Sequence, residues 1–484
     1  MTTSPACCSI VPPYLLRALV ASGDPLLAER AEAALVYDET LRRGRVTAEA
    51  RPGGRTARPS ATPGDASGPQ RTVHDAEHGT TLPGTTVRSE GEPPTADEAV
   101  TQAYDGLGAT WQLWMDAYAR NSLDGKGLPL VATVHYGTDY DNAFWDGTQM
   151  VFGDGDGVVF LGFTRSLDVI GHELAHGVTQ YTAGLNYQDQ SGALNESVSD
   201  VFGVLVKQHS LGQAATDADW LIGAELLAPG VQGVALRSMA APGTAYDDPR
   251  LGTDPQPAHM DHYVDTADDN GGVHINSGIP NKAFHDLAVA LGGNAWEAPG
   301  RIWYDALTGD IAADCDFATF AALTLAAATA RHGEGSREAE AVATAWAGVG
   351  VTPAGTTGSG SGDGSTTGGS TPADPGTPPS PDAPAPAPGT EVAVRRTGGF
   401  AGRTRERTVV LGELPEEDGA AWRSLLQTDR LQGLAAAADR DYPDAYCYGV
   451  RCAVPEVDVT VPEPVLTDDV RDLLERTLRG GDTA

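Results

Sequence analysis

The sequence predicts an α+β fold, with a two-lobed central domain that is β-rich in its N-terminal lobe and mainly α-helical in its C-terminal lobe. Residues 130–164 contain short apolar runs separated by glycine turns, which is typical of strands. Residues 168–183, 195–210, 277–292 and 317–331 show the apolar spacing expected of helices. Strands therefore come first and helices follow, and this order favours an α+β architecture over an alternating α/β sheet.

Two low-complexity stretches divide the chain. Residues 46–70 are rich in Pro, Gly, Ser, Thr and Arg, and residues 354–390 change from Gly/Ser-rich to Pro/Ala-rich. Such compositions predict linkers. Helical periodicity in residues 10–45 predicts a short helical segment before the first linker. We expect five segments: a helical N-terminal segment at 1–50, a linker at 51–70, the central domain at 71–352 with lobes at 71–167 and 168–352, a linker at 353–390, and a small α+β module at 391–484.

The charge of the chain excludes some partners. Its 484 residues carry a formal net charge of −34, with lysine only at Lys126, Lys207 and Lys282. Such a chain repels nucleic acids and anionic lipids, so neither is expected as a partner. The sequence contains no run of 18 apolar residues, so no transmembrane helix is expected. The N-terminus has no basic stretch before its first apolar residues, so it does not resemble an ordinary signal peptide.

The cysteines do not predict a disulfide framework or a CxxC metal site. There are five: Cys7, Cys8, Cys315, Cys447 and Cys452. Cys447 and Cys452 could pair with each other or remain free thiols, and the sequence leaves both possibilities open.

The stretch VIGHELAHGV at 169–178 places His172 and His176 four residues apart on a predicted helix. Side chains at i and i+4 share one helix face, so both imidazoles can bind one Zn²⁺. Glu173 lies beside the first histidine, where a carboxylate can act as general base on zinc-activated water. Two histidines on a helix also occur without a metal, so the pattern needs a third protein ligand.

Glu196 is the candidate for that third ligand. It lies in NESVSD, at 195–200, where the next predicted helix begins. Asp200 follows one turn later on the same face, and a carboxylate behind a zinc-binding histidine fixes its tautomer and strengthens its donation. Two histidines, one glutamate and an open fourth position are typical of catalytic rather than structural zinc.

Three blocks together resemble a known family: residues 171–200, residues 269–287 (DNGGVHINSGIPNKAFHDL) and residues 142–157 (NAFWDGTQMVFGDGDG). They are similar to the thermolysin family of zinc metalloendopeptidases, and the resemblance covers about 71–352. It implies the two-lobed fold and hydrolysis of internal peptide bonds, before a bulky apolar residue. The VKQ sequence at 206–208 is typical of the protealysin branch.

The resemblance also implies roles for individual residues. The implied zinc ligands are His172, His176 and Glu196, supported by Asn195 and Asp200; the implied catalytic residues are Glu173, Tyr187, His274 and Asp269; the implied substrate-binding residues are Asn142, Ala143 and Arg237. Tyr187 and His274 would donate hydrogen bonds to the oxyanion, with Asp269 orienting His274. Arg237 would bind the carbonyl next to the scissile bond.

One departure from the family concerns calcium. Positions that correspond to calcium ligands in the family hold Lys207, Leu221 and Ala224, whereas Asp168 and Asp219 remain. A lysine ammonium can replace a dication there by pairing with the remaining carboxylates. We therefore expect zinc dependence with weak or absent calcium dependence.

The N-terminal flank resembles a pro-segment. Residues 8–20 (CSIVPPYLLRALV) are similar to the short propeptide of protealysin-like precursors, with Pro12, Pro13 and Tyr14 as the signature. This similarity implies an inhibitory segment in or near the cleft. The alternative is a cysteine switch, in which a thiolate of one of the two N-terminal cysteines caps the zinc.

The C-terminal flank resembles an inhibitor. Residues 392–418 (VAVRRTGGFAGRTRERTVVLGELPEED) are similar to emfourin, a small protein inhibitor associated with protealysin-like enzymes. The similarity implies that this module regulates the protease. A domain for substrate or surface binding is the alternative.

The sequence thus predicts a zinc metalloendopeptidase that acts on proteins and peptides, made as a latent monomeric precursor with a regulator at each end. From a different class, it could be an inactive protease-like binding or inhibitor protein, but the implied catalytic residues are all present. The family is largely extracellular, which implies secretion. Cytoplasmic retention is the alternative, because no ordinary signal peptide is visible.

Overall fold

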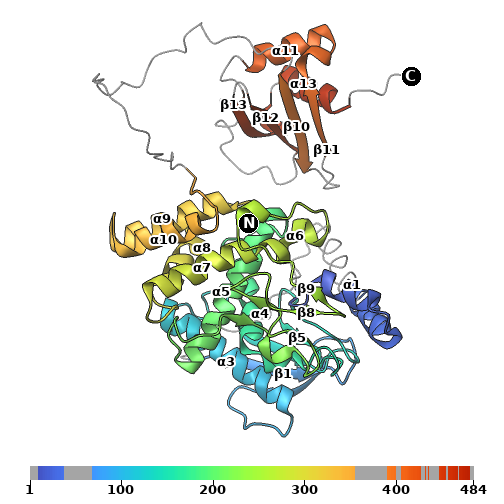
Figure 1. Cartoon of the computed structure of the whole chain (residues 1–484), viewed down its shortest axis with the longest axis vertical. Coiled ribbons are helices and arrows are strands. Elements are labelled where there is room, and N and C mark those ends of the chain that lie inside the picture. Colours follow the sequence, from blue (N-terminus) through green and yellow to red (C-terminus); the bar gives the residue numbers. More distant parts are fainter. Residues whose placement is uncertain are drawn as a thin grey trace. The chain divides into compact units, whose positions relative to one another are not determined.

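The computed structural model divides into two compact units, Met1–Ser361 and Gly362–Ala484, each with its own hydrophobic core (Figure 1). The described residues are 9–36, 68–354, 390–398, 405–426, 431, 434, 446–453, 456–466 and 468–479. Cys7, Cys8 and most of both expected linkers lie outside these ranges. Within them, no helix is long and apolar enough to cross a membrane.

The N-terminal lobe of the first unit contains a five-stranded sheet of order β2-β1-β3-β5-β4. Its strands are β1 (Arg71–Asp75), β2 (Thr85–Ser89), β3 (Leu130–Val134), β4 (Ala143–Trp145) and β5 (Met150–Phe152). The β1–β3 and β3–β5 pairs are parallel, and the outer strands β2 and β4 are antiparallel to their neighbours. Every residue of β4 and β5 is buried, so β4 is an edge strand that other parts of the chain must cover.

Helices dominate the rest of the unit. They are α1 (Pro13–Ala21), a helix at 25–36, α3 (Glu98–Tyr118), α4 (Leu167–Gln180), α5 (Asp189–Leu211), α6 (Asp269–Asn276), α7 (Gly278–Leu291), α8 (Ala298–Thr308), α9 (Phe317–His332) and α10 (Arg337–Gly348). Two short hairpins pair β6 (Leu221–Ile222) with β7 (Arg237–Ser238) and β8 (Asp247–Asp248) with β9 (Gly252–Thr253). The predicted α+β fold with a β-rich and a helical lobe is confirmed.

Helix α3 was not indicated by the sequence. Gly106 and Gly108 interrupt its apolar pattern, yet Gly106 allows close packing, because a Cβ there would lie 2.4 Å from the Ile170 side chain. The helix begins because Asp97 accepts hydrogen bonds from the amides of Ala99 and Val100. It packs against β1 and β3 and joins the sheet to the helical lobe.

Helices α4 and α5 lie side by side in the centre of the unit (Figure 1). Two glycines allow this close approach. A Cβ on Gly203 would lie 2.4 Å from the carbonyl oxygen of Asp168, and a Cβ on Gly171 would lie 3.0 Å from the Cα of Gly203. The predicted helices at 168–183 and 195–210 are thus brought into contact along their functional faces.

The described residues of the second unit form a four-stranded antiparallel sheet of order β11-β10-β12-β13 together with the helices α11 and α13. Its elements are β10 (Glu391–Gly398), β11 (Arg405–Val410), α11 (Glu416–Leu426), β12 (Tyr446–Ala453), β13 (Glu456–Pro462) and α13 (Asp468–Arg479). Trp422 of α11 and Leu474 of α13 are fully buried in its core. Cys447 and Cys452 are both free. They lie five residues apart on one strand, about 17 Å along it and on opposite faces, so they cannot pair.

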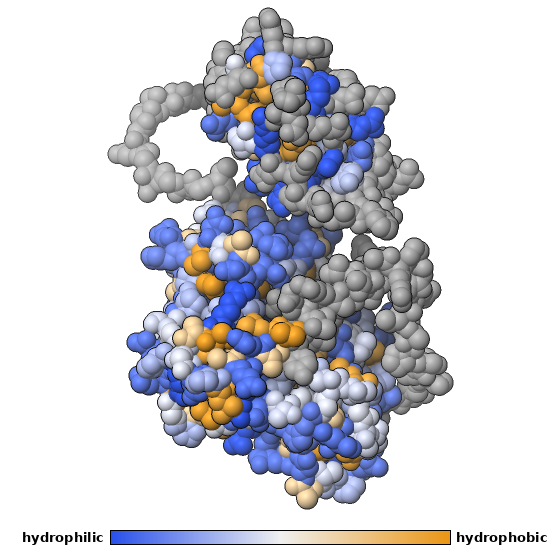
Figure 2. Space-filling view, turned by 90° about the vertical axis from the view of Figure 1, so that its right-hand side faces the viewer, coloured by the Kyte–Doolittle hydropathy of each residue, from blue (hydrophilic) through white to orange (hydrophobic). Residues whose placement is uncertain are grey.

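The surface agrees with the acidic, polar composition. The face shown in Figure 2 is mostly hydrophilic, and its apolar patches are small and separate. Large exposed apolar side chains such as Leu26, Met115 and Leu211 come from different elements. Such scattered residues are ordinary for a protein surface.

Candidate active site

Two adjacent helices bring the predicted zinc ligands together. Helix α4 carries His172 and His176, whose Nε2 atoms are 3.0 Å apart. Helix α5 carries Glu196, whose Oε2 lies 3.5 Å from His172 Nε2 and whose Oε1 lies 3.6 Å from His176 Nε2. The three side chains are buried, and their ligand atoms lie within 4.8 Å of one another. Their arrangement can hold one metal ion.

The protonation of this group fits a cation at its centre. His172 Nδ1 lies 2.8 Å from Asp200 Oδ1, and His176 Nδ1 lies 2.9 Å from Asn195 Oδ1. With a proton on each Nδ1, the two Nε2 lone pairs face each other. Burial lowers the pKa of His176 to about 4, so it is neutral at pH 7 as a ligand must be. Glu196 Oε2 is buried without a hydrogen-bond partner. This donor set of two imidazoles and one carboxylate matches Zn²⁺.

Asp200 links His172, a predicted zinc ligand, to Arg237, which the sequence predicts to bind substrate. Besides His172, it accepts hydrogen bonds from Arg237 Nη2 at 2.7 Å and Nε at 2.9 Å, and from Asn281 Nδ2 at 2.8 Å. Burial opposes its ionisation, but Arg237 and His172 outweigh burial and hold the pKa of Asp200 well below its usual range. Asp200 is therefore a carboxylate that fixes both partners. The sequence had not singled out Asn281.

Glu173 of α4 lies beside the same group and is held by β4. Its Oε2 accepts a hydrogen bond of 3.0 Å from the backbone amide of Trp145. Its Oε1 is buried and has no hydrogen-bond partner. Burial and then the nearby Glu196 raise the pKa of Glu173 well above its ordinary value. A carboxylate with a raised pKa, held by one oxygen and free at the other, is suited to accept and return a proton.

Tyr187 and His274 meet beside Glu196. Tyr187 Oη lies 3.2 Å from His274 Nε2 and also hydrogen-bonds Glu196. His274 Nδ1 lies 2.8 Å from Asp269 Oδ1, and its backbone amide donates to Asp269 Oδ2 at 3.0 Å. Burial alone would lower the pKa of His274, but Asp269 and Glu196 outweigh it and raise that pKa. The imidazole is thus favoured as a charged donor.

The backbone before His274 has an unusual conformation. Residues 270–272 all have positive φ, at 52°, 84° and 71°. Gly271 is required there, because a Cβ would lie 2.1 Å from Asp189 Oδ1. Gln256 Nε2 then donates to the carbonyl oxygen of His274 at 2.8 Å. The glycine turn and Gln256 therefore fix His274 in the site.

The predicted substrate-binding residues are occupied by the chain's own N-terminal segment. Ile10 donates its amide to the Ala143 carbonyl at 3.1 Å, and its carbonyl accepts from Arg237 Nη1 at 3.2 Å. Val11 exchanges two hydrogen bonds with the Asn142 side chain, at 2.9 and 3.2 Å. Both residues are fully buried. These contacts come from the two residues before the predicted Pro12-Pro13-Tyr14 motif.

The proline motif turns the segment from extended chain into helix. Pro12 is extended at the N-cap, and Pro13 starts α1 as its first residue, where a missing N–H costs nothing. Leu15, Leu16 and Leu19 of α1 are buried in the core of the unit. The motif thus connects the strand-like residues in the cleft to a docked helix.

Lys207 of α5 lies among the carboxylates with which it was predicted to pair in place of calcium. Its Nζ lies 3.1 Å from Asp168, 3.2 Å from Asp219 and 3.4 Å from Glu225. Burial opposes its charge, but the three carboxylates outweigh burial and raise the pKa of Lys207. The predicted pairing with Asp168 and Asp219 is present. Glu225 is a third partner that the sequence had not indicated.

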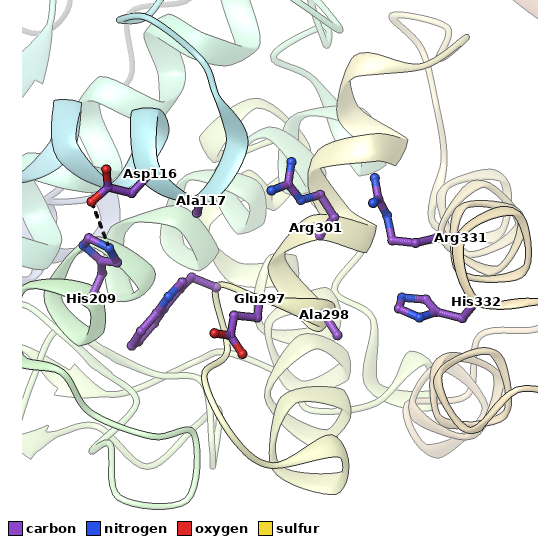
Figure 3. Close-up of a pocket in the computed structure, with 9 residues that line it drawn as sticks. Asp116, Ala117, His209, Glu297, Ala298, Arg301, Arg331 and His332 are labelled. Atoms are coloured by element: carbon purple, nitrogen blue, oxygen red, sulfur yellow. Dashed lines mark ion pairs between the residues drawn. The ribbon is translucent and has the colours of Figure 1, made fainter.

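A pocket of about 400 Å³ lies elsewhere, between the ends of α3, α5, α8 and α9 (Figure 3). Two of its lining residues form ion pairs: His209 with Asp116 at 3.7 Å, and Arg331 with Asp305 at 2.6 Å. None of its lining residues belongs to the zinc group. We assign it no part in the reaction.

Comparison with known families identifies three matching regions. Residues 64–180 match the model "Thermolysin metallopeptidase, catalytic domain", and residues 183–351 match "Thermolysin metallopeptidase, alpha-helical domain". Residues 394–478 match "Emfourin".

Individual proteins show the same similarity. An extracellular metalloprotease of Pectobacterium carotovorum subsp. carotovorum is 53% identical over 325 residues, covering 67% of this chain and 91% of that protein. Protease PrtS of Photorhabdus sp. (strain Az29) is 58% identical over 258 residues, covering 53% and 70%. Among solved structures, the precursor of protealysin from Serratia proteamaculans matches with a TM-score of 0.64 and 51% identity, covering 71% of this chain and all (100%) of that one.

The fold, the His172–His176–Glu196 group and these matches agree with one another. Of the two classes that the sequence left open, they support the enzyme. The chain is a zinc-dependent metalloendopeptidase of the thermolysin family, similar to the protealysin branch, and it carries a C-terminal emfourin domain.

Proposed function

We propose that this chain is a latent precursor that hydrolyses internal peptide bonds of proteins with Glu173 as general base. The observation that carries the proposal is the unpartnered, buried Oε1 of Glu173 beside the ligand group of His172, His176 and Glu196. Zn²⁺ held by these ligands would polarise the scissile carbonyl and lower the pKa of water at the site to about 7. Glu173 takes a proton from the attacking water and returns it to the leaving amine.

The remaining residues bind and orient. Tyr187 and His274 donate hydrogen bonds to the oxyanion as charge develops on it, and Asp269 keeps the His274 ring in place. Asn142, Ala143 and Arg237 bind the substrate backbone. The support for this last role is their binding of the backbone of Ile10 and Val11.

Residues 9–36 keep the precursor latent by filling the substrate site. Ile10 and Val11 use the hydrogen bonds that a substrate would need, and α1 holds them there. Two exposed ion pairs add to the docking, Arg17 with Asp268 at 3.5 Å and Arg30 with Asp139 at 2.6 Å. Any role of Cys7 or Cys8 lies outside the described residues. Removal of the segment is expected to open the site.

The C-terminal emfourin domain lowers the activity of the catalytic unit. The support is the family match at 394–478 and its attachment to the same chain as the protease. In enzyme from which the N-terminal segment has been removed, cutting the chain at residue 353 should therefore raise the peptidase activity. Adding the isolated module back separates inhibition within one chain from inhibition between chains.

The enzyme acts outside the cell, as a monomer, and its dependence on calcium is weak or absent. Relatives in Pectobacterium carotovorum and Serratia marcescens are named as extracellular metalloproteases, which supports secretion. Lys207 among three carboxylates supports calcium independence.

The test of Glu173 compares wild type with Glu173→Gln after removal of residues before 68. Casein hydrolysis should fall by about 100- to 10,000-fold in the variant, while bound zinc and the melting temperature stay the same, because glutamine can still accept from the Trp145 amide. Wild-type activity should disappear with a zinc chelator and return with Zn²⁺. A variant as active as wild type would refute the role of Glu173.

A further inference from the structure

The N-terminal segment lies in the cleft with the register of a substrate. Ser9 and Phe144 form an antiparallel bridge, and the next hydrogen bond runs from the Ile10 amide to the Ala143 carbonyl. The Ile10 carbonyl then meets Arg237, and Val11 meets Asn142. These are the residues proposed to bind the backbone of a substrate.

This register selects one peptide bond. Arg237 is proposed to bind the carbonyl next to the scissile bond, and here it holds the carbonyl of Ile10. The residue after the scissile bond is then Ile10, and the bond itself joins Ser9 to Ile10. Ile10 is apolar, β-branched and fully buried, as the preference for cleavage before a bulky apolar residue requires.

The general base lies beside this bond. A bridge pair flanked by hydrogen bonds turns its own N–H and C=O away from the partner strand, so the Ser9 carbonyl faces away from β4. Ser9 pairs with Phe144, and the following amide, that of Trp145, donates to Glu173 at 3.0 Å. The amide that holds Glu173 is therefore one residue along β4 from the residue that pairs with Ser9.

The neighbouring bonds are protected. Both polar atoms of the Ile10–Val11 peptide group are held, the carbonyl by Arg237 and the amide by Asn142. The next two bonds, Val11–Pro12 and Pro12–Pro13, involve proline, whose ring and missing N–H make them poor protease substrates. Ser9–Ile10 is thus the bond that the segment offers to the site.

We propose that Ser9–Ile10 is a self-processing site, cleaved within the same molecule before the rest of the N-terminal segment is removed. The inference rests on the proposed peptidase function. The water oxygen bonds to the Ser9 carbonyl carbon, the C–N bond to Ile10 breaks, and the Ile10 nitrogen takes up a proton. The products are a peptide of residues 1–9 and a chain that begins at Ile10.

The clipped chain is still latent. Leu15, Leu16 and Leu19 remain buried in the core, and the contacts of Ile10 and Val11 lie on the retained side of the cut. The first cleavage therefore leaves the substrate site filled, and activity on other proteins has to wait for a second cleavage after residue 36.

The test follows the intact mass and the N-terminal sequence of zinc-loaded, full-length precursor over a 100-fold range of dilution. Loss of residues 1–9 at a rate independent of concentration is expected, with casein hydrolysis still low, and Glu173→Gln should stay intact. Ile10→Asp should slow the cut by about 100-fold, because it buries a carboxylate. The matched control Leu26→Asp, at a position 53% exposed in the same segment, should leave the rate within about twofold.

A second measurement needs no activity. In zinc-free, full-length Glu173→Gln, hydrogen exchange should show protected amides at Ile10 and Val11, and Asn142→Ala should remove the protection at Val11. Cleavage at another bond, a rate proportional to concentration, or unprotected amides would overturn the proposal. The proposal would also be overturned if the precursor kept residues 1–9 while the same preparation hydrolysed casein once its N-terminal segment had been removed. No casein hydrolysis after that removal would instead refute the proposed function.

Discussion

Lys207→Met should destabilise the catalytic unit through a carboxylate left without its cation. The ammonium lies within 3.1–3.4 Å of Asp168, Asp219 and Glu225. Methionine keeps the apolar part of the lysine side chain and removes the charge. The variant therefore isolates the electrostatic contribution of Lys207.

The size of the expected loss in unfolding free energy depends mainly on Asp168. Its side chain is fully buried, whereas those of Asp219 and Glu225 are 48% and 44% exposed and can be solvated without a partner. Breaking a buried ion pair by removing one partner costs about 3–5 kcal/mol. With one of three carboxylates buried, we expect the low end, about 3 kcal/mol. The unit spans Met1–Ser361, and with an unfolding entropy of about 2.1 cal/mol/K per residue the loss lowers the melting temperature by about 4 °C.

Thermal unfolding of zinc-loaded protein at pH 7 measures this effect. The matched control is Lys282→Met, which removes a half-exposed pair with Asp286 on α7 and should cost about 0.5 kcal/mol or less. Added calcium should recover part of the loss in Lys207→Met, since three carboxylates become available, and should leave wild type unchanged. A Lys207→Met variant that melts within about 2 °C of wild type would refute the reasoning.

Two further predictions concern other buried polar groups. Asn281→Leu removes the donor to Asp200 Oδ2 and should weaken zinc binding about 10- to 100-fold, measured by competition with a chelator; unchanged affinity would show that Asn281 only fills space. Hydrogen bonds to Asp154 and Asp97 raise the pKa of His135 to about 9, although burial of the ring opposes this rise. Because this folded-state pKa exceeds the unfolded value, the stabilisation is complete below about pH 6.5 and is lost as pH rises through 9. The stability difference between wild type and His135→Gln, from chemical denaturation at pH 6 and pH 10, should therefore shrink at the higher pH; a difference that does not change with pH would contradict this assignment.

The sequence could predict the zinc group because its geometry is local. Helical spacing alone puts His172, Glu173 and His176 on adjacent turns, and Glu196 and Asp200 one turn apart on the next helix. The sequence also encodes the close approach of the two helices, because Gly171 and Gly203 leave room for it. Tyr187, His274 and Arg237 lie in separate segments of the chain. Their places in the site could therefore be predicted only from the resemblance to a family.

Other features depend on tertiary packing and left no pattern in the sequence. Glu225 meets Lys207 from a short turn between two-residue strands, and Asn281 reaches Asp200 across 81 positions of the chain. The N-terminal segment contacts the cleft through the backbone of Ile10 and Val11, and backbone hydrogen bonds place little demand on residue type. The proline motif beside them was visible because proline restricts the chain locally.

The hydrogen-bond partners of the buried carboxylates separate structural from reactive groups. Asp200 accepts four hydrogen bonds, and Asp168 accepts from Ser166, Lys207 and Gly223. The oxygens of both are occupied by these donors and have little capacity left to bind anything else. Glu173 and Glu196 are equally buried, yet each keeps one oxygen without a hydrogen-bond partner. An unpartnered buried carboxylate oxygen is costly unless a ligand or a proton occupies it. This contrast supports the proposal that metal and substrate bind at the two glutamates, whereas the two aspartates hold neighbouring elements in place.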